Sequence, residues 1–296
     1  MYQIVRKKEL AKNIYYMEVK ASRIAKASKP GQFIIAKIDE RGERIPLTIC
    51  DYNSKEGLVS IVFQVVGEST RKMSLLSSGD YFKDFVGPLG VESELIHENI
   101  EDLKSKSILF VAGGVGVAPI YPQVKWLHLN GIKCDVIIGA KNKDMLIFEE
   151  EIKKVARNLY IVTDDGSYGA KGLVTDKIEE LVNNRGKKYD LVVSIGPMIM
   201  MKFVTLLTKK LDIPTVVSLN PIMVDGTGMC GACRVTVGNE VKFACVHGPE
   251  FDGHKVDFDE AMRRQSIYKT EEGRQYLKHI EGKTHSGGCG NCGGNK

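Results

Sequence analysis

The stretch SILFVAGGVGVAP, residues 107–119, decides the fold of this chain. Its first part, residues 107–112, is an apolar run of the kind found in strands buried on both faces of a parallel sheet. Glycines follow at 113, 114 and 116, and Pro119 suits the first turn of a helix. Strand, glycine-rich turn and helix together can hold a phosphate group at the helix N-terminus. The spacing is G-G-x-G and not G-x-G-x-x-G, so the turn alone does not identify a dinucleotide site.

Alternating strands and helices are expected after this unit. The expected strands are 135–139, 160–163, 191–195 and 215–219, and the expected helices are 147–157, 174–184 and 198–211. This alternation is typical of a parallel sheet flanked by helices, which binds ligands at the carboxyl ends of its strands. The loops 113–119, 164–172 and 196–198 are therefore candidate nucleotide contacts. Asp165 is the candidate in the second loop, where ordinary turn geometry explains the residue equally well.

Residues 2–90 have a different pattern, with short apolar or alternating runs separated by turn residues. The expected strands are 2–6, 14–19, 32–38, 46–51, 59–66 and 81–86. Six strands with almost no helical periodicity indicate an antiparallel barrel or sandwich. Arg44 and Thr48 share one strand, and Gly67, Ser69 and Thr70 lie at an expected helix N-terminus, so both places could bind an anion. A surface arginine and an ordinary helix cap explain either place on its own.

The stretch DGTGMCGACRVTVGNEVKFAC, called here the 225–245 segment, carries candidate metal ligands. Asp225, Cys230, Cys233 and Cys245 have the spacing D-x4-C-x2-C-x11-C. This copies the C-x4-C-x2-C…C pattern of plant-type [2Fe–2S] proteins, with a carboxylate in the first position. The three cysteines with His247 also match a Cys3His zinc site. Spacing alone leaves both metals open.

Composition narrows the class of protein. A chain of 296 residues with 43% hydrophobic and 27% charged residues is typical of a soluble protein of about two domains. The net charge of +5 without a basic stripe indicates no nucleic-acid partner. No apolar run is long enough for a membrane span, and no signal peptide is evident. Seven cysteines, mostly in CxxC-type settings, favour a reducing cytoplasm. Cys289 and Cys292 form one such pair, in what we interpret as a flexible reduced tail.

Taken together, the motifs resemble those of the ferredoxin–NADP reductase superfamily. The motifs are RxPLT at 44–48, GxST at 67–70, GGVGVAP at 113–119 and IGPM at 195–198. The 225–245 segment narrows the resemblance to electron-transfer subunits, over roughly residues 1–265. The dihydroorotate dehydrogenase branch typically has cysteine in the first ligand position. Asp225 instead resembles the small (alpha) subunits of NADH-dependent reduced ferredoxin:NADP oxidoreductase and the sulfide dehydrogenase subunit.

This resemblance implies three cofactors, namely FAD, NAD(H) and a [2Fe–2S] cluster bound by Asp225, Cys230, Cys233 and Cys245. The implied FAD contacts are Pro46, Leu47, Thr48, Phe63, Gln64, Val65, Gly67, Ser69 and Thr70. Arg44 joins this set as the candidate anion-binding arginine of the same strand as Thr48. The implied nicotinamide nucleotide contacts are Gly113, Gly114, Val115, Gly116, Val117, Pro119, Gly196, Pro197 and Met198. Two positions depart from the family: Leu47 stands where many members have an aromatic residue, and Ile195 where many have cysteine.

The expected organisation has four parts: an antiparallel six-stranded FAD-binding barrel (1–98), a parallel-sheet NAD(P)-binding domain (99–221), a small [2Fe–2S] region (222–265), and a C-terminal helix with a flexible tail (266–296). A flavin can take a hydride from nicotinamide and give single electrons to a cluster, so the parts form one electron path. Zinc has no redox role, so the context favours iron–sulfur.

We therefore expect an electron-transfer subunit of an electron-bifurcating NADH-dependent ferredoxin:NADP oxidoreductase. It would pass electrons to a larger redox subunit with a second flavin or further iron–sulfur clusters, and indirectly to ferredoxin and NADP(H). The alternatives are a dihydroorotate dehydrogenase or sulfide dehydrogenase subunit, and a non-catalytic flavin module with structural zinc. No basic pocket for a 2′-phosphate can be placed in the sequence, so the choice of NADH over NADPH comes from the resemblance alone.

Overall fold

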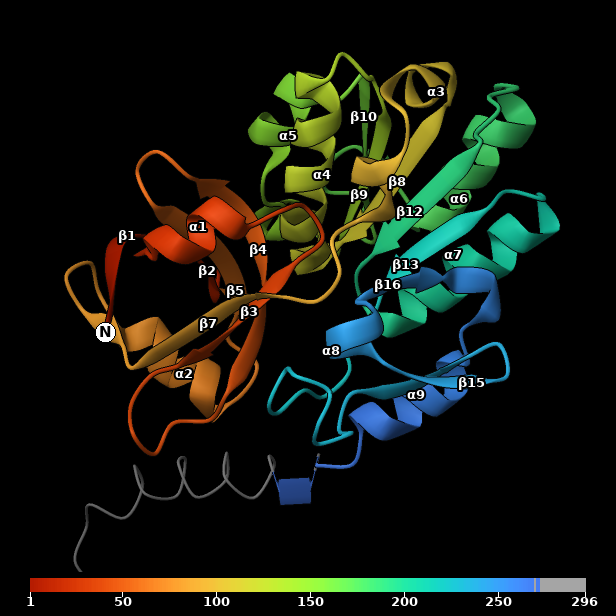
Figure 1. The fold of residues 1–296 in the computed structure, drawn as a ribbon. Helices are drawn as coiled ribbons and strands as arrows, with labels where there is room; N and C mark the ends of the chain where they lie inside the picture. Colours follow the sequence, from red (N-terminus) through yellow and green to blue (C-terminus); the bar gives the residue numbers. More distant parts are fainter. Residues whose placement is uncertain (269, 272–296) are drawn as a thin grey trace, which may run out of the picture.

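A computed structural model describes residues 1–268 and 270–271 of the chain. A strand-rich unit holds the N-terminus, an α/β unit lies beside it, and the C-terminal part of the described chain lies below the α/β unit (Figure 1). Cys289 and Cys292, with most of the predicted C-terminal helix and tail, lie outside the described residues. Within that described part, no helix is both long and apolar enough to cross a membrane.

The first unit is an antiparallel sheet that curls into a nearly closed barrel. Its strands are β1 (Tyr2–Ala11), β2 (Ile14–Lys20), β3 (Phe33–Lys37), β4 (Ile45–Asn53), β5 (Leu58–Gln64), β6 (Tyr81–Phe82) and β7 (Asp84–Leu89), in the order β6-β1-β2-β5-β4-β3-β7. The end strands β6 and β7 are chain neighbours separated by Lys83, so the chain itself nearly closes the barrel. The predicted antiparallel barrel is confirmed, but the sheet has seven strands because Lys83 divides the last expected run in two.

Two short helices belong to the barrel. Helix α2 (Glu68–Leu75) begins after Gly67, where a helix was expected. Helix α1 (Ser22–Ala27) was not expected from the sequence. It has only six residues, of which Ile24 and Ala25 are buried, and so short a segment shows no measurable periodicity.

The second unit is the predicted parallel sheet, confirmed in its central strands. Its strands are β8 (Ile108–Gly113), β9 (Asp135–Ala140), β10 (Asn158–Thr163), β11 (Ala170–Lys171), β12 (Leu191–Ile195), β13 (Thr215–Ser218) and β16 (Glu250–Asp252), in the order β11-β10-β9-β8-β12-β13-β16. All pair in parallel except β16, which runs antiparallel to β13. The carboxyl ends of the parallel strands therefore meet at one edge of the sheet.

Helices cover both faces of this sheet. They are α3 (Ile100–Ser105), α4 (Val117–Leu129), α5 (Glu149–Val155), α6 (Val174–Glu179), which continues as a π-helical turn over Glu180–Asn184, and α7 (Met198–Lys210). Phe110 of β8 packs with α3, α4 and α5 in one core. Its neighbour Leu109 packs with α6 and α7 in the other core. Burial on both faces explains why β8 reads as one apolar run.

The 225–245 segment leads into a small C-terminal region. A hairpin of β14 (Arg234–Val237) and β15 (Glu240–Phe243) is followed by α8 (Ala244–His247), β16 and α9 (Phe258–Gln265). Because β16 pairs with β13, this region shares a sheet with the nucleotide-type unit. The domain limits expected from the sequence stay predictions.

One buried carboxylate fixes the amino-terminal edge of the sheet, opposite the carboxyl ends of the parallel strands. Asp135 opens β9 with a fully buried side chain. Its Oδ1 accepts hydrogen bonds from Arg157 Nε and Asn158 Nδ2, both at 2.8 Å. Its Oδ2 accepts from Lys187 Nζ at 2.6 Å and Tyr189 OH at 2.9 Å. Burial raises the pKa of Asp135, but these hydrogen bonds outweigh it and lower the pKa to about 2.

Replacing this carboxylate should cost stability. We expect Asp135→Ala to lower the free energy of unfolding by about 3–5 kcal/mol, because it leaves the partly buried cations Arg157 and Lys187 without their counter-charge. Urea denaturation at pH 7, followed by circular dichroism, measures the change. The control is Glu150→Ala, which removes an exposed carboxylate 4.0 Å from Lys153 and should cost less than about 0.5 kcal/mol. Equal losses in the two variants would contradict this role of Asp135.

Candidate functional site

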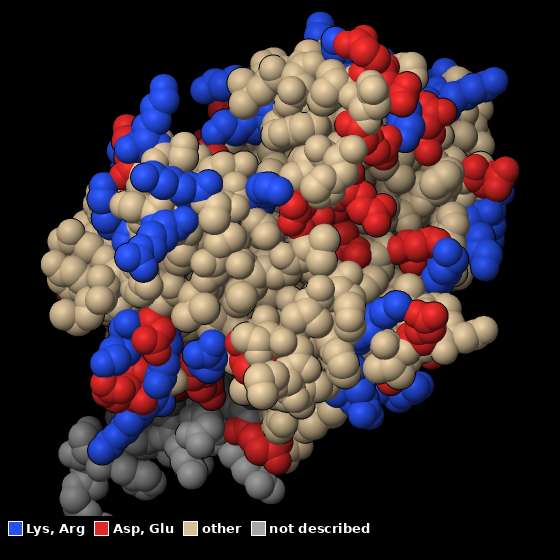
Figure 2. Space-filling view, viewed as in Figure 1, with Lys and Arg blue, Asp and Glu red and all other residues tan. Residues whose placement is uncertain are grey.

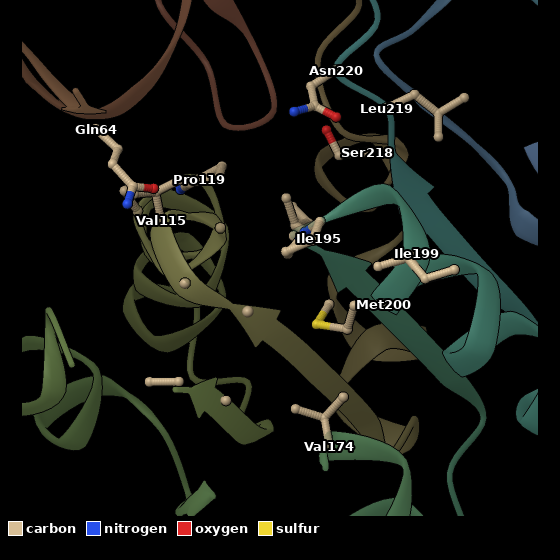
Figure 3. A pocket seen from close by; sticks show the side chains of 18 of the residues that line it. Gln64, Val115, Pro119, Val174, Ile195, Ile199, Met200, Ser218, Leu219 and Asn220 are labelled. Atoms are coloured by element: carbon tan, nitrogen blue, oxygen red, sulfur yellow. The ribbon is translucent and has the colours of Figure 1, made fainter. Parts of the chain in front are cut away.

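A cavity of about 1240 Å³ lies between the barrel wall and the carboxyl ends of the parallel strands. The barrel contributes residues of β4 and β5, and the sheet contributes the residues that follow β8, β9, β12 and β13. Figure 3 shows Gln64 of the barrel reaching towards Val115 and Pro119, while Ile195, Met200 and Ser218 lie across the opening. Both folding units therefore build one site.

The glycine-rich turn after β8 is in backbone contact with the loop after β12. A Cβ atom on Gly116 would lie 2.2 Å from the carbonyl oxygen of Ile195, and one on Gly196 would lie 3.0 Å from the backbone nitrogen of Gly113. Only glycine permits so close an approach. Helix α4 begins at Val117, and its first-turn residues Ala118 and Pro119 line the cavity. The positive end of the helix dipole thus faces the cavity and favours a phosphate there.

Many of the residues expected from the sequence line this cavity. They are Pro46, Leu47, Thr48, Phe63, Gln64, Thr70, Gly113, Gly114, Val115, Gly116, Pro119, Gly196 and Pro197. The expected residues that do not line it are Arg44, Val65, Gly67, Ser69, Val117, Asp165 and Met198.

The residues outside the cavity have other contacts. Val117 is buried in a core of the α/β unit, and Met198 is buried in the core shared with the C-terminal region. The Ser69 hydroxyl donates to the Glu43 carboxylate. The Asp165 carboxylate accepts from the backbone N–H of Ser167 at 2.9 Å and shapes its own turn.

The cavity also has lining residues that the sequence analysis did not single out. Polar members of this set are Lys141, Asp164, Thr175, Asp176, Glu179, Lys210, Ser218 and Asn220. Lys141, Asp164 and Asn220 directly or closely follow β9, β10 and β13. Asp164 begins the candidate loop 164–172. The rule that ligands bind at the carboxyl ends of strands would also have found Lys141 and Asn220 if applied to β9 and β13.

A polar junction joins the barrel linker, α4 and β16 behind this cavity. The carboxylate of Glu250 accepts a hydrogen bond from Gln123 Nε2 at 2.6 Å, and Ser93 Oγ donates to Gln123 Oε1 at 3.3 Å. Burial raises the pKa of Glu250 to about 7, although the neighbouring Ser93 hydroxyl and the hydrogen bond from Gln123 oppose that shift. The preceding residue, Pro249, lines the cavity.

The four candidate metal ligands lie in two pairs. Cys233 and Cys245 are buried, with their sulfur atoms 3.2 Å apart. Cys230 is exposed, and its backbone N–H donates to Asp225 Oδ2 at 2.9 Å. Thr227 N donates to Asp225 Oδ1 at 2.8 Å, and these hydrogen bonds lower the pKa of Asp225. Each carboxylate oxygen keeps a second lone pair for a metal. Within residues 1–268 and 270–271, no three acidic, histidine or cysteine side chains converge on one point.

The barrel holds the start of the 225–245 segment directly. Arg44 Nε donates to the carbonyl oxygen of Val224 at 2.9 Å, and Arg44 Nη2 donates to that of Asp225 at 3.2 Å. A Cβ atom on Gly226 would lie 2.6 Å from Ile35 Cδ1 and 2.9 Å from Leu89 Cδ1, so the segment packs closely on β3 and β7. Arg44, expected to contact FAD, thus has a structural contact with the metal-ligand segment.

Two family models match parts of the chain. Residues 110–205 match an oxidoreductase NAD-binding domain, and residues 220–257 match the iron-sulfur cluster binding domain of dihydroorotate dehydrogenase B. The first match contains the glycine-rich turn and the second contains all four candidate ligands. The iron–sulfur site is thus favoured over the zinc site that the spacing left open.

Relatives also match this chain over nearly its whole length. An uncharacterized protein from the adh 3′ region of Clostridium beijerinckii is 66% identical over 100% of both chains. A homolog of the electron transfer subunit of dihydroorotate dehydrogenase B (NAD(+)) from Thermotoga maritima is 45% identical over 94% of this chain and 95% of the relative. A chain in the structure of NADH-dependent reduced ferredoxin-NADP oxidoreductase superposes with a TM-score of 0.86 at 43% identity, covering 95% of this chain and 98% of that one.

The contact between the two glycine loops gives a direct test of the site. We expect Gly116→Ala to push the turn away from Ile195 and weaken NADH binding about tenfold, because overpacking costs about 1–3 kcal/mol. Titration with NADH under anaerobic conditions measures the dissociation constant. The control is Gly67→Ala, since a Cβ there meets nothing within 4 Å. Unchanged NADH affinity in Gly116→Ala would contradict a role for this turn.

Proposed function

Because the chain belongs to the family of dihydroorotate dehydrogenase B electron-transfer subunits and their homologues, we propose that it exchanges a hydride between NAD(H) and FAD and delivers single electrons to a partner subunit. When bound, FAD supplies the two-electron to one-electron conversion, and a [2Fe–2S] cluster supplies the single-electron exit. The residues of this chain bind these groups, orient them and keep them close together.

One observation carries this proposal most directly: the cavity and the metal-ligand segment are continuous. Leu219, Asn220, Pro221 and Met223 line the cavity, and Asp225 follows two residues after Met223. An electron that leaves a flavin in the cavity would thus have only a short path to the 225–245 segment. A zinc site would gain nothing from such a position.

We assign the two walls of the cavity to different nucleotides. The barrel residues Pro46, Leu47, Thr48, Phe63, Gln64 and Thr70 would hold FAD. The glycine-rich turn and the Gly196–Pro197 pair would hold NAD(H), with its diphosphate at the N-terminus of α4. The relatives are named for NAD(+), and we extend that preference to this chain.

The donor set fits a [2Fe–2S] cluster. Two tetrahedral irons need two protein ligands each, and the pairs Asp225 with Cys230 and Cys233 with Cys245 would supply them. Burial of Cys233 and Cys245 would shield one iron, while the exposed Cys230 would leave the other near the surface. Thiolate ligands and free cysteines also suit a reducing compartment, and a cytoplasmic location stays a prediction.

We further propose a larger partner that carries a second flavin or further iron–sulfur clusters, through which ferredoxin and NADP(H) react. Apolar side chains are exposed next to the ligands: Met229 is 89% exposed, and Val224 is 48% exposed. Such side chains beside a redox exit suit a protein interface. The structural match to a chain of NADH-dependent reduced ferredoxin-NADP oxidoreductase, at a TM-score of 0.86, favours electron bifurcation. A dihydroorotate dehydrogenase complex is the second candidate, because homologues carry that name.

Spectroscopy of the purified full chain tests the proposal. We expect flavin and iron–sulfur absorption, two irons and two sulfides per chain, and bleaching of the flavin by NADH without oxygen. Cys245→Ser should lose iron but keep NADH-dependent bleaching, since it removes only a cluster ligand. Cys134→Ser, a buried cysteine in the core next to β9, is the control and should keep its iron. A colourless protein that contains zinc would overturn the proposal.

A further inference from the structure

Helix α9 brings one arginine to the metal-ligand segment. Arg264 lies near the end of α9, and its Nη2 donates to the carbonyl oxygen of Ala232 at 3.1 Å. Ala232 stands between Gly231 and Cys233, two residues after Cys230. The guanidinium therefore contacts the backbone between two candidate cluster ligands.

The rest of this guanidinium lacks a partner among the described residues. The Nε atom of Arg264 is buried and donates no hydrogen bond there. No carboxylate within residues 1–268 and 270–271 forms an ion pair with Arg264. A half-buried cation with a buried, unsatisfied donor costs free energy unless an acceptor lies beside it, and an anion would satisfy both the donor and the charge.

The helix that carries Arg264 is held firmly in place. Phe258 and Ala261 of α9 are buried in the same core cluster as Cys233 and Cys245. The next residue, Gln265, donates from Nε2 to the carbonyl oxygen of Asn220 at 3.0 Å, and Asn220 lines the cavity. Consecutive side chains of α9 thus fix the ligand segment and the cavity edge together. Arg264 cannot easily leave the segment to find a partner in solvent.

A [2Fe–2S] cluster with three thiolates and one carboxylate is an anion, and its negative charge grows when it accepts an electron. Hydrogen bonds and positive charge next to a cluster stabilise its reduced form and raise its potential. We propose that Arg264 is a positioning residue that supplies this missing counter-charge and raises the reduction potential of the cluster in the 225–245 segment. This inference rests on the proposed function, since it requires the cluster to be present.

Redox titration of the full chain, followed by electron paramagnetic resonance and iron analysis, tests the inference. We expect Arg264→Gln to keep its iron and to shift the one-electron equilibrium about tenfold towards the oxidised cluster, a drop of about 59 mV. Arg264→Lys keeps a positive charge without the planar donors. Its reduction potential should lie between those of the wild type and Arg264→Gln. The matched control is Arg263→Gln, which removes the same charge from the same helix at an exposed position and should leave the potential unchanged.

Each outcome bears on the inference. Wild-type potentials in both Arg264 variants, or an equal drop in Arg263→Gln, would overturn it. If Arg264→Gln loses iron, Arg264→Lys carries the test, and a wild-type potential there would overturn the role of the guanidinium. A wild-type chain without any iron–sulfur cluster would instead overturn the proposed function. A cluster whose potential is the same in all four proteins would overturn only the assignment of Arg264.

Discussion

The guanidinium of Arg44 joins the barrel to the start of the 225–245 segment through the carbonyl oxygens of Val224 and Asp225. The rest of the site depends on this contact, because Arg44 directly precedes β4, whose residues form the barrel wall of the cavity. Two hydrogen bonds therefore connect the segment proposed to hold the cluster to the start of the strand proposed to hold FAD. Electron transfer between them needs a short and constant distance, and a single side chain helps to fix it.

Much of this arrangement could be predicted from the sequence. The strand β8 reads as an apolar run because both of its faces are buried, and the glycines at 113, 114 and 116 mark the turn that approaches Ile195. These features are local, so a short stretch of sequence contains them. The spacing of Asp225 and its three cysteines is equally local. The comparisons bear out the family, the fold and the cofactors that these motifs predict.

Features that depend on distant residues could not be predicted in this way. Arg44 has the spacing of an anion-binding arginine, but its partners lie about 180 residues away in the chain. Strand β16 has three residues, too few for an alternating pattern. It forms because its backbone pairs with β13, which is distant in sequence. The loop 164–172 was expected from the sequence, but which of its two aspartates lines the cavity depends on how the turn leaves β10: Asp164 lines it and Asp165 does not.

The short edge strands of the α/β sheet matter before any partner arrives. Strand β11 has two residues and β16 has three, so the edge strands at both sides of this sheet are short. Long open edges recruit strands from other chains and start aggregation. Short edge strands lower this risk for the chain before the proposed partner binds. For the same reason, β11 and β16 give the proposed partner little backbone to pair with, and we expect it to contact side chains.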